Sequence, residues 1–421
     1  MKLTLLKSSF LLILEKFARL ALGFLTSIFV VRYLGPANFG ELSYIQAFYT
    51  VVSFLGILGT TEILSRELSL GNRNKSEFIS AVLFVRIAGT LIASLLTVGV
   101  SLQQGWQGYQ NILVLTLLLT MLINISDINQ TILFVERQAS WISISRFIGS
   151  IFSNILKIFL VFSGAPLAFF LVPLLLDSIV IGSVTFVLLN RLDYRVRLKF
   201  PSLVTLLFLL KKSLPLGASM FLISLHLRID QLMLKEFITL SDLGQYSVAI
   251  RLIEIFYIIP TAVAANLLPY LVQLNRDDPV QFREAIKNYL FYCIWAGIVV
   301  AVVLFFSSNM IIFSIYGLEF SDSAVYLRYL GICFLFVAVG TIGGIWQTVE
   351  DKQKYRFYIQ LFGLFTNVLL NVILIRNLGA LGAALATIIT LFLVTFVYPV
   401  IFKDLRSFVS LMISSIFFFP R

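Results

Sequence analysis

Twelve long apolar stretches run through this chain of 421 residues, and each is long enough to cross a membrane as an α-helix. About 20 consecutive apolar residues span the hydrocarbon core of a bilayer in helical form. The stretches of the first half are Phe10–Val31, Ser43–Ile63, Phe78–Val100, Asn111–Val135, Ser140–Val161 and Leu167–Leu189. Those of the second half are Leu214–Phe237, Gly244–Leu268, Asn288–Phe306, Ala324–Val349, Tyr355–Ile375 and Leu378–Phe402. Continuous stretches do not fit the short alternating strands of a membrane barrel. The sequence therefore predicts an all-α, polytopic helical membrane protein with twelve transmembrane helices.

The composition agrees with a lipid environment. Hydrophobic residues make up 59% of the chain and charged residues 13%, whereas roughly a quarter of an ordinary soluble domain is charged. One further apolar segment, Ser407–Phe419, is too short to span a bilayer comfortably. We expect it to lie at the membrane surface.

The net charge of +11 does not indicate nucleic-acid binding, because the basic residues gather in alternate connections between the predicted spans. The connections assigned to one side of the membrane carry 21 basic residues. The alternate connections carry only Arg32, Lys235, Arg328 and Arg376. Positively charged residues in short loops stay in the cytoplasm. This pattern predicts a multi-pass protein of the bacterial inner membrane with both termini cytoplasmic, and anionic lipid headgroups as partners of its basic loops.

Short segments of the first half recur in the second half. The recurring pairs, in the same order along each half, are Phe39–Tyr44 with Leu243–Val248, Val135–Glu136 with Val349–Glu350, and Gly149 with Gly363. The two glycine offsets, from Gly40 to Gly244 and from Gly149 to Gly363, are nearly equal, and both divide the chain near its middle. Such echoes indicate an internal duplication.

The duplication predicts two six-helix lobes, residues 1–200 and residues 201–421. Because each half contains an even number of spans, both halves start on the same side of the membrane. We therefore expect a pseudo-two-fold axis along the membrane normal. The basic connection Asn190–Lys212 is either an amphipathic helix on the cytoplasmic face or a plain linker.

Several kinds of chemistry find no support in the sequence. His226 is the only histidine, and Cys293 and Cys333 lie inside predicted spans without the spacing of a metal site. The sequence contains no glycine-rich phosphate loop. We expect no metal centre and no bound cofactor.

Ionisable residues inside the predicted spans remain as candidates for function. Such groups are costly in a bilayer and usually face a bundle interior or an aqueous cavity. The bases are Arg19, Arg86, Arg146, Lys157, Arg228 and Arg251, and the acids are Asp127, Asp177, Asp230 and Glu254. Some of these residues could instead form structural ion pairs along one helix, as Glu15 with Arg19 and Arg251 with Glu254.

Four segments resemble the signatures of polysaccharide flippases of the Wzx type. They are Arg32–Tyr44, Arg228–Leu234 with the following Gly244–Ser247, Asn367–Leu374, and Leu378–Thr387. The same superfamily holds the multidrug (MATE) exporters and the lipid II flippase. The resemblance extends over essentially the whole chain.

The resemblance implies two lobes around a central cavity and transport by alternating access. The substrate would be an undecaprenyl-pyrophosphate-linked oligosaccharide, moved from the cytoplasmic to the periplasmic leaflet for O-antigen, lipopolysaccharide, capsule or exopolysaccharide biosynthesis. The basic residues Arg19, Arg86, Arg146, Lys157, Arg228 and Arg251 would line the cavity and bind the pyrophosphate, since arginine contacts phosphate bidentately. The acidic residues Asp127, Asp177, Asp230 and Glu254 are candidates for coupling to a proton or a sodium ion. Other polysaccharide assembly proteins are further candidate partners.

Two alternatives remain open at this point. A MATE-like, ion-coupled exporter of small molecules would prefer acidic cavity residues, which Asp127, Asp177 and Asp230 provide. A membrane polysaccharide polymerase would need a sizeable external loop with catalytic residues, and the predicted connections are short. We therefore expect a transporter and not an enzyme.

Overall fold

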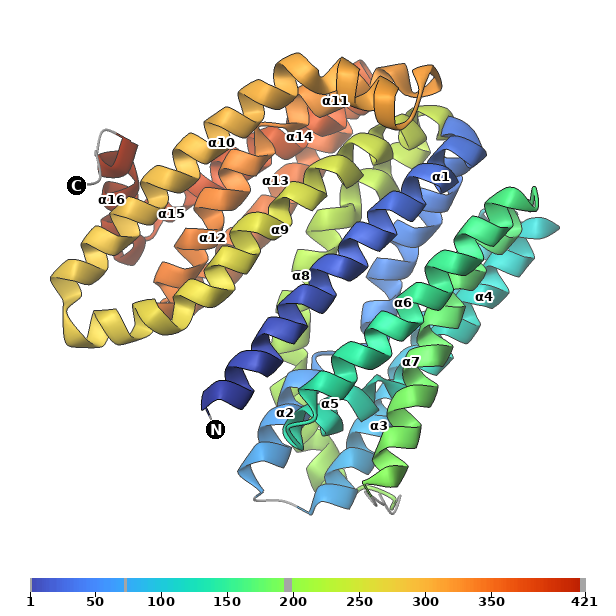
Figure 1. The fold of residues 1–421 in the computed structure, drawn as a ribbon, viewed down its shortest axis with the longest axis horizontal. Helices are drawn as coiled ribbons and strands as arrows, with labels where there is room; N and C mark the ends of the chain where they lie inside the picture. Colours follow the sequence, from blue (N-terminus) through green and yellow to red (C-terminus); the bar gives the residue numbers. More distant parts are fainter. Residues whose placement is uncertain (1, 72–73, 193–198, 417–421) are drawn as a thin grey trace. The chain divides into compact units, whose positions relative to one another are not determined.

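The computed structural model describes residues 2–71, 74–192 and 199–416, with side chains from residue 18 onward. Within these ranges the chain consists of helices and short connections, and it contains no strand (Figure 1). The prediction of an all-α fold is confirmed.

The chain forms two compact units. Unit 1 consists of Met1–Leu34 and Phe48–Ser224, and unit 2 consists of Gly35–Ala47 and Leu225–Arg421. Helices α1 (Lys2–Ile57) and α8 (Leu203–Phe237) each contribute residues to both units. The division at residues 200 and 201 concerns the duplicated halves and stays a prediction, as does the axis that relates them.

Unit 1 is built from α1, the first part of α8 and the helices between them. These helices are α2 (Thr60–Leu70), α3 (Lys75–Gln103), α4 (Tyr109–Ile123), η1 (Asn124–Asp127), α5 (Ile128–Val135), α6 (Ala139–Phe162), η2 (Leu167–Leu171) and α7 (Val172–Arg191). Its core includes Leu64, Val82, Ile132 and Leu209, which are fully or almost fully buried.

Unit 2 contains the remaining helices and the segment Gly35–Ala47 of α1. They are α9 (Leu240–Asp277), α10 (Pro279–Ile315), η3 (Leu318–Phe320), α11 (Ser321–Leu330), α12 (Cys333–Val349), α13 (Gln353–Leu378), α14 (Ala380–Phe392), η4 (Leu393–Val397), α15 (Tyr398–Ile401), η5 (Lys403–Leu405) and α16 (Arg406–Ile416). Leu290, Val339, Trp346 and Phe408 belong to its core.

Among the described residues, ten helices are long and apolar enough to cross a membrane, or eleven if a bent pair is counted as one span. The bent pair is Leu318–Leu330 with Cys333–Val349, at an angle of 43°. The first of the ten, Ala18–Leu70, has 53 residues and holds two of the predicted apolar stretches, Phe10–Val31 in large part and Ser43–Ile63. The twelve predicted stretches lie wholly or in large part on these ten helices and the bent pair, and the prediction of a polytopic membrane fold is confirmed.

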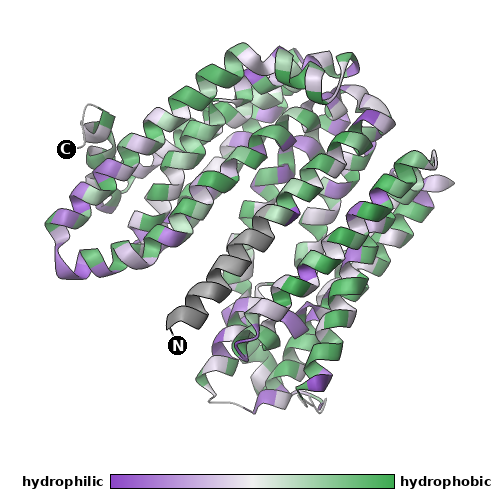
Figure 2. Cartoon of the chain, in the orientation of Figure 1, coloured by the Kyte–Doolittle hydropathy of each residue, from purple (hydrophilic) through white to green (hydrophobic). Residues whose placement is uncertain are grey.

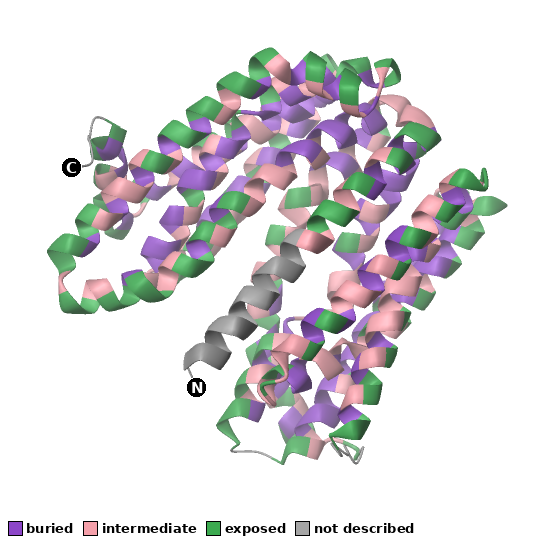
Figure 3. Cartoon of the chain, viewed as in Figure 1, coloured by how far each residue is buried: buried purple, intermediate pink, exposed green. Residues whose placement is uncertain are grey.

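The outer faces of the helices are apolar. Leu95, Leu102, Phe162 and Phe306 are between 72% and 81% exposed. Figure 2 and Figure 3 show many hydrophobic residues among those that the fold leaves exposed. Large contiguous apolar surfaces are rare on soluble monomers, whereas lipid tails solvate them without cost.

Helix α1 is kinked at Gly35. This residue has φ 67° and ψ 175°, a conformation that favours glycine, and Pro36 follows it. Proline removes one helical hydrogen bond and widens the kink. The sequence predicts that one span ends before Gly35 and the next begins after it. In the structure the two spans are joined by the kink within α1.

The second sequence echo marks the same turn in both units. After Val135–Glu136, Arg137 has φ 60°, and the N–H of Gln138 donates to the carbonyl of Leu133 (2.8 Å). After Val349–Glu350, Asp351 has φ 55°, and the N–H of Lys352 donates to the carbonyl of Gln347 (2.7 Å). This is the Schellman ending of a helix with a left-handed residue at C′. The duplication is therefore visible in local backbone geometry.

The sequence predicted membrane-surface positions for two segments, the basic connection before α8 and the apolar tail, and the structure treats them differently. Residues 203–212 are the first turns of α8 and not a separate surface helix, because Leu209 is fully buried in the core of unit 1. The described part of the predicted tail Ser407–Phe419 belongs to α16, and residues 417–419 lie outside the described residues. Phe408 and Met412 of α16 pack into the core of unit 2, while Ile413 stays 58% exposed. This two-sided helix fits an interfacial position, which stays a prediction.

Candidate functional site

The ten ionisable residues predicted for the site divide unequally between the two units. Unit 1 holds Arg19, Arg86, Asp127, Arg146, Lys157 and Asp177. Unit 2 holds Arg228, Asp230, Arg251 and Glu254. Four bases and two acids leave unit 1 with excess positive charge, whereas two bases and two acids balance in unit 2.

Asp177 on α7 is the centre of the charge cluster in unit 1. Its carboxylate lies within electrostatic reach of Arg19, Lys157 and Arg146. Gly149 on α6 makes room for it, because a Cβ atom at this position would lie 2.6 Å from Asp177 Oδ1. All four charged side chains are half-buried. The structure thus places Asp177 within electrostatic reach of three cations predicted from sequence, while its buried Oδ1 has no hydrogen-bond partner among the described residues.

A neutral amide connects this cluster to Asp127. The Nε of Arg146 donates to Gln130 Oε1 (2.7 Å), and the amide of Gln130 donates to the Asp127 carboxylate. Gln130 on α5 thereby fixes the direction of the Arg146 guanidinium. Sequence reasoning missed Gln130 because it considered ionisable residues alone. The polar pair Asn129–Gln130 within an apolar stretch was the available signal.

Arg86 is held differently. It is only 1% exposed, and it donates to the hydroxyls of Thr60 (3.0 Å) and Thr61 (2.8 Å) on α2. Its remaining terminal nitrogen has no hydrogen-bond partner among the described residues. Arg86 is one of the residues that line a cavity of about 50 Å³. These bonds tie α3 to α2. Substrate binding by Arg86 stays a prediction.

In unit 2, Glu254 on α9 pairs with Arg228 on α8. The nitrogen–oxygen distances of this ion pair are 3.0 Å and 3.5 Å. The pairing of Glu254 with Arg251, considered from the sequence, does not form. Arg251 instead lies over the ring of Phe39, 5.2 Å from its centroid. Within the described part of the chain no hydrogen-bond partner of the Arg251 guanidinium is found.

Asp230 on α8 is buried, with 7% of its surface exposed. Its carboxylate accepts hydrogen bonds from Tyr246 Oη (2.9 Å), from Asn371 Nδ2 (2.7 Å) and from the hydroxyl of Thr387. Asn371 also donates to Asn367 Oδ1 (3.0 Å). Among the described residues no cation forms an ion pair with Asp230. A buried carboxylate surrounded by neutral groups is a suitable place for a proton or a small cation.

Three of the segments that carry the family resemblance meet at Asp230. They contribute Asp230 itself from α8, Asn367 and Asn371 from α13, and Thr387 from α14. Sequence reasoning named Asp230 alone. Two asparagines four residues apart in an apolar helix lie on one face, and this spacing was the signal for a buried polar cluster.

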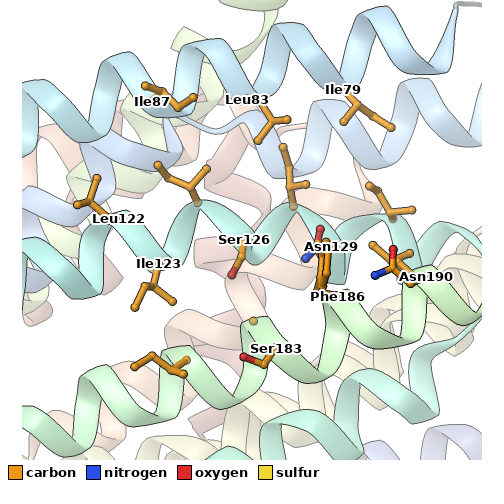
Figure 4. Close-up of a pocket in the computed structure, with 16 residues that line it drawn as sticks. Ile79, Leu83, Ile87, Leu122, Ile123, Ser126, Asn129, Ser183, Phe186 and Asn190 are labelled. Carbon is orange, nitrogen blue, oxygen red and sulfur yellow. The ribbon is translucent and has the colours of Figure 1, made fainter. Parts of the chain in front are cut away.

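An apolar groove of about 1010 Å³ follows α3, α5 and α7 of unit 1 (Figure 4). Ile79, Leu83 and Ile87 of α3 form one wall, and Phe186 belongs to the opposite wall. The groove also has a few polar side chains, which are Ser126, Asn129, Ser183 and Asn190. From Ile179 to Asn190 it extends along α7 by roughly 16 Å at 1.5 Å per residue. That is about the thickness of one leaflet of the hydrocarbon core.

The fold is that of known flippases and multidrug transporters. It matches lipid II flippase MurJ in an inward closed conformation with a TM-score of 0.72, at 18% identity over 96% of this chain and 90% of that one. It also matches an inward-facing MATE transporter of the MOP superfamily with a TM-score of 0.68, at 16% identity over 94% of this chain and 96% of that one. These similarities define the class as a helical, MATE-like membrane protein.

Residues 5–275 match the family described as polysaccharide biosynthesis protein, and residues 215–373 match the MatE family. The first match covers more than half of the chain, which therefore belongs to the polysaccharide biosynthesis protein family. The resemblance to polysaccharide flippases is thereby confirmed.

Curated relatives are similar over shorter regions. Capsular polysaccharide biosynthesis protein CapF of Staphylococcus aureus is 24% identical over 192 residues, 45% of this chain and 48% of CapF. Probable flippase AglR of Haloferax volcanii is 27% identical over 169 residues, 39% of this chain and 35% of AglR. The aligned regions thus span less than half the length of these relatives.

Proposed function

We propose that this protein moves a lipid-linked oligosaccharide, with an undecaprenyl pyrophosphate carrier, from the cytoplasmic to the periplasmic leaflet. The observation that carries the proposal is the cluster of Arg19, Arg146 and Lys157 around Asp177 in unit 1. A pyrophosphate cannot enter hydrocarbon unless other groups replace its water, because unpaired buried charge is very costly. Positively charged side chains near Asp177 supply that replacement.

The residues of the cluster have different roles in this proposal. Arg146, aligned by Gln130, offers its free N–H groups as a fork to two phosphate oxygens. Lys157 acts as a point charge. The step requires no covalent chemistry, so the protein works as a transporter and not as an enzyme. In unit 2, Arg251 offers a second guanidinium.

The carrier's hydrocarbon chain needs an apolar surface while its headgroup is bound. The groove along α3, α5 and α7 offers such a surface in unit 1, about one leaflet long. We assign the isoprenoid chain to this groove. The family supports a role in polysaccharide assembly, and the basic loops support a bacterial inner-membrane position with both termini in the cytoplasm.

The test is surface polysaccharide in a flippase-deletion strain that carries each variant. We expect Arg146→Ala and Lys157→Ala to abolish surface polysaccharide and to accumulate lipid-linked repeat units, with normal protein level in the membrane. The control is Arg191→Ala at the exposed end of α7, which removes the same charge outside the cluster and should leave polysaccharide unchanged. Full polysaccharide from the Arg146→Ala, Lys157→Ala double variant would contradict the proposal.

A second candidate function is ion-coupled export of small molecules. The buried Asp230 favours it, because a carboxylate without an ion-pair partner among the described residues can exchange a proton or a sodium ion. In an exporter-deficient strain, resistance to cationic dyes that disappears in Asp230→Asn would support export. If the strain gains no resistance while polysaccharide is restored, the flippase proposal stands and small-molecule export is rejected.

A further inference from the structure

A pocket of about 200 Å³ in unit 2 lies apart from the charged residues discussed above. Its walls come from α12, α13, α14, η4, α15 and α16. Three glycines of α12, Gly340, Gly343 and Gly344, leave the space open. The guanidinium of Arg356 lies against Gly344, with one nitrogen 3.4 Å from the position of a Cβ atom there.

Two polar groups in this pocket lack protein partners. The side chain of Gln347 is 92% buried (8% exposed), and its Oε1 accepts no hydrogen bond within the described chain. The guanidinium of Arg356 likewise has no hydrogen-bond or ion-pair partner among the described residues. A buried acceptor left unsatisfied costs free energy. Arg356 is exposed, so a ligand can reach its guanidinium from outside the pocket. The unsatisfied Gln347 oxygen in the same pocket as this cation points to a ligand that combines an anion with a hydroxyl donor.

The pocket also has a local backbone irregularity. Residues Leu393–Val397 form one turn of π-helix, and Val394 and Thr395 from this turn line the pocket. Single π-helical turns within α-helices are frequent at functional sites. Here the turn directs the hydroxyl of Thr395 to the carbonyl of Phe336 (3.4 Å).

The position along the helices indicates the depth of the pocket. Arg356 lies in the first turn of α13, and Gln347 lies in the last turn of α12. The intervening turn and the start of α13 carry Lys352 and Lys354. Basic helix ends gather at the cytoplasmic surface, where anionic headgroups concentrate. The apolar part of the lining, including Phe336, Leu391 and Phe408, suits the upper part of lipid chains.

We propose that this pocket binds the headgroup of an anionic phospholipid with a free hydroxyl, of the phosphatidylglycerol type. Arg356 binds the phosphate, because the guanidinium fork matches its oxygens. A headgroup hydroxyl donates to Gln347 Oε1. The apolar lining accepts the first part of the acyl chains. The site is independent of the proposed transport substrate.

The experiment measures the thermal stability of the purified full chain in neutral detergent as phosphatidylglycerol is added. A lipid that binds the folded protein raises its Tm in a concentration-dependent way. We expect Arg356→Gln to weaken the apparent affinity at least about tenfold, which is the loss of one charge-assisted contact. Gly340→Val should do the same with Arg356 intact, since its side chain would occupy the open space. Lys354→Gln is the matched control, with the same charge change on the same turn, and should behave as wild type.

Four comparisons can overturn the proposal. An equal loss of lipid affinity in Lys354→Gln and Arg356→Gln would mean a general effect of surface charge. Wild-type lipid affinity in both Arg356→Gln and Gly340→Val would exclude this pocket as the binding site. If phosphatidylethanolamine or phosphatidylcholine raises the Tm as much as phosphatidylglycerol does, the site does not select an anionic headgroup with a hydroxyl, and the proposal is wrong. Glycerol phosphate without chains should stabilise far less than the lipid. If it stabilises equally, the ligand is a soluble phosphate and not a lipid.

Discussion

Gly40 and Gly244, the two glycines of the first sequence echo, pack directly against each other in unit 2. A Cβ atom on Gly40 would lie 1.8 Å from the carbonyl oxygen of Leu240, and one on Gly244 would lie 1.9 Å from that of Pro36. The contact is reciprocal, since Leu240 precedes Gly244 by the same four residues that separate Pro36 from Gly40. Small residues let helix backbones approach this closely. The echo thus marks a helix crossing formed by corresponding residues of the two halves.

Gly244→Ala should destabilise the folded protein by about 3 kcal/mol, at the upper end for overpacking, because one of the two backbones must move to admit the methyl group. Thermal unfolding in detergent measures the change. Gly99→Ala is the control, since no atom lies within 4 Å of a Cβ atom at that position on α3. Its stability should stay within about 1 kcal/mol of wild type. If Gly244→Ala unfolds at the wild-type temperature, the two helices do not approach as closely at this crossing as the structure indicates.

Arg86→Leu should lower stability by roughly 2–3 kcal/mol, since two charge-assisted hydrogen bonds to Thr60 and Thr61 are lost from a buried position. Arg146→Ala should lower transport instead, at nearly unchanged stability. Comparing unfolding and surface polysaccharide for both variants separates the two roles. An Arg86→Leu variant that is fully stable but inactive would place Arg86 in the substrate site.

The ion pair of Arg228 with Glu254 predicts a coupled double-mutant cycle. Either single change to alanine leaves a half-buried charge unpaired and should destabilise by roughly 1–2 kcal/mol, after allowance for solvent screening. The double variant should recover most of that loss. If the double variant is stable but transports nothing, Arg228 contributes to substrate binding beyond the pair. Additive losses would mean that the two charges act separately.

Asp230→Asn should keep the fold and uncouple transport from its driving ion, because the amide is similar in shape but carries no charge. The measurement is uptake of labelled lipid-linked sugar into proteoliposomes with an imposed proton or sodium gradient. Wild type should respond to one of the two gradients, and Asp230→Asn should respond to neither. Asn371→Leu, which removes a neutral donor, should shift the ion dependence without abolishing it. An unchanged gradient response in Asp230→Asn would exclude Asp230 as the coupling site.

Ile87→Trp should reduce transport several-fold by filling the groove of unit 1 with an indole ring. Ile92→Trp is the matched control on the same helix, since Ile92 lies outside the groove and the two side chains are 47% and 53% exposed. Surface polysaccharide at equal protein level is the readout. Equal loss in both variants would mean that any bulky change on this lipid-facing helix impairs the protein.

Much of the fold could be predicted from the sequence, because the solvent of this chain is lipid. Backbone groups in hydrocarbon must bond within their own segment, so long apolar stretches become helices wherever they stand. The echo at Glu136 and Glu350 indicated a duplication, and the structure adds that both copies end a helix in the same way, since helix endings depend on neighbouring residues. The start of α8 was not predicted, because Leu209 is buried by distant helices and not by its own neighbours.

The sequence by itself determined the apolar helices, the duplication and the set of charges that a membrane interior must accommodate. Only the tertiary structure decided which charges meet. Glu254 pairs with Arg228 on another helix instead of Arg251 nearby, and Asp230 is bonded by Asn371 and Thr387, which are 141 and 157 residues away. Each helix can turn about its own axis, and this rotation is fixed by packing against its neighbours. Local sequence sets which side chains share a face of a helix, but not which helix that face meets.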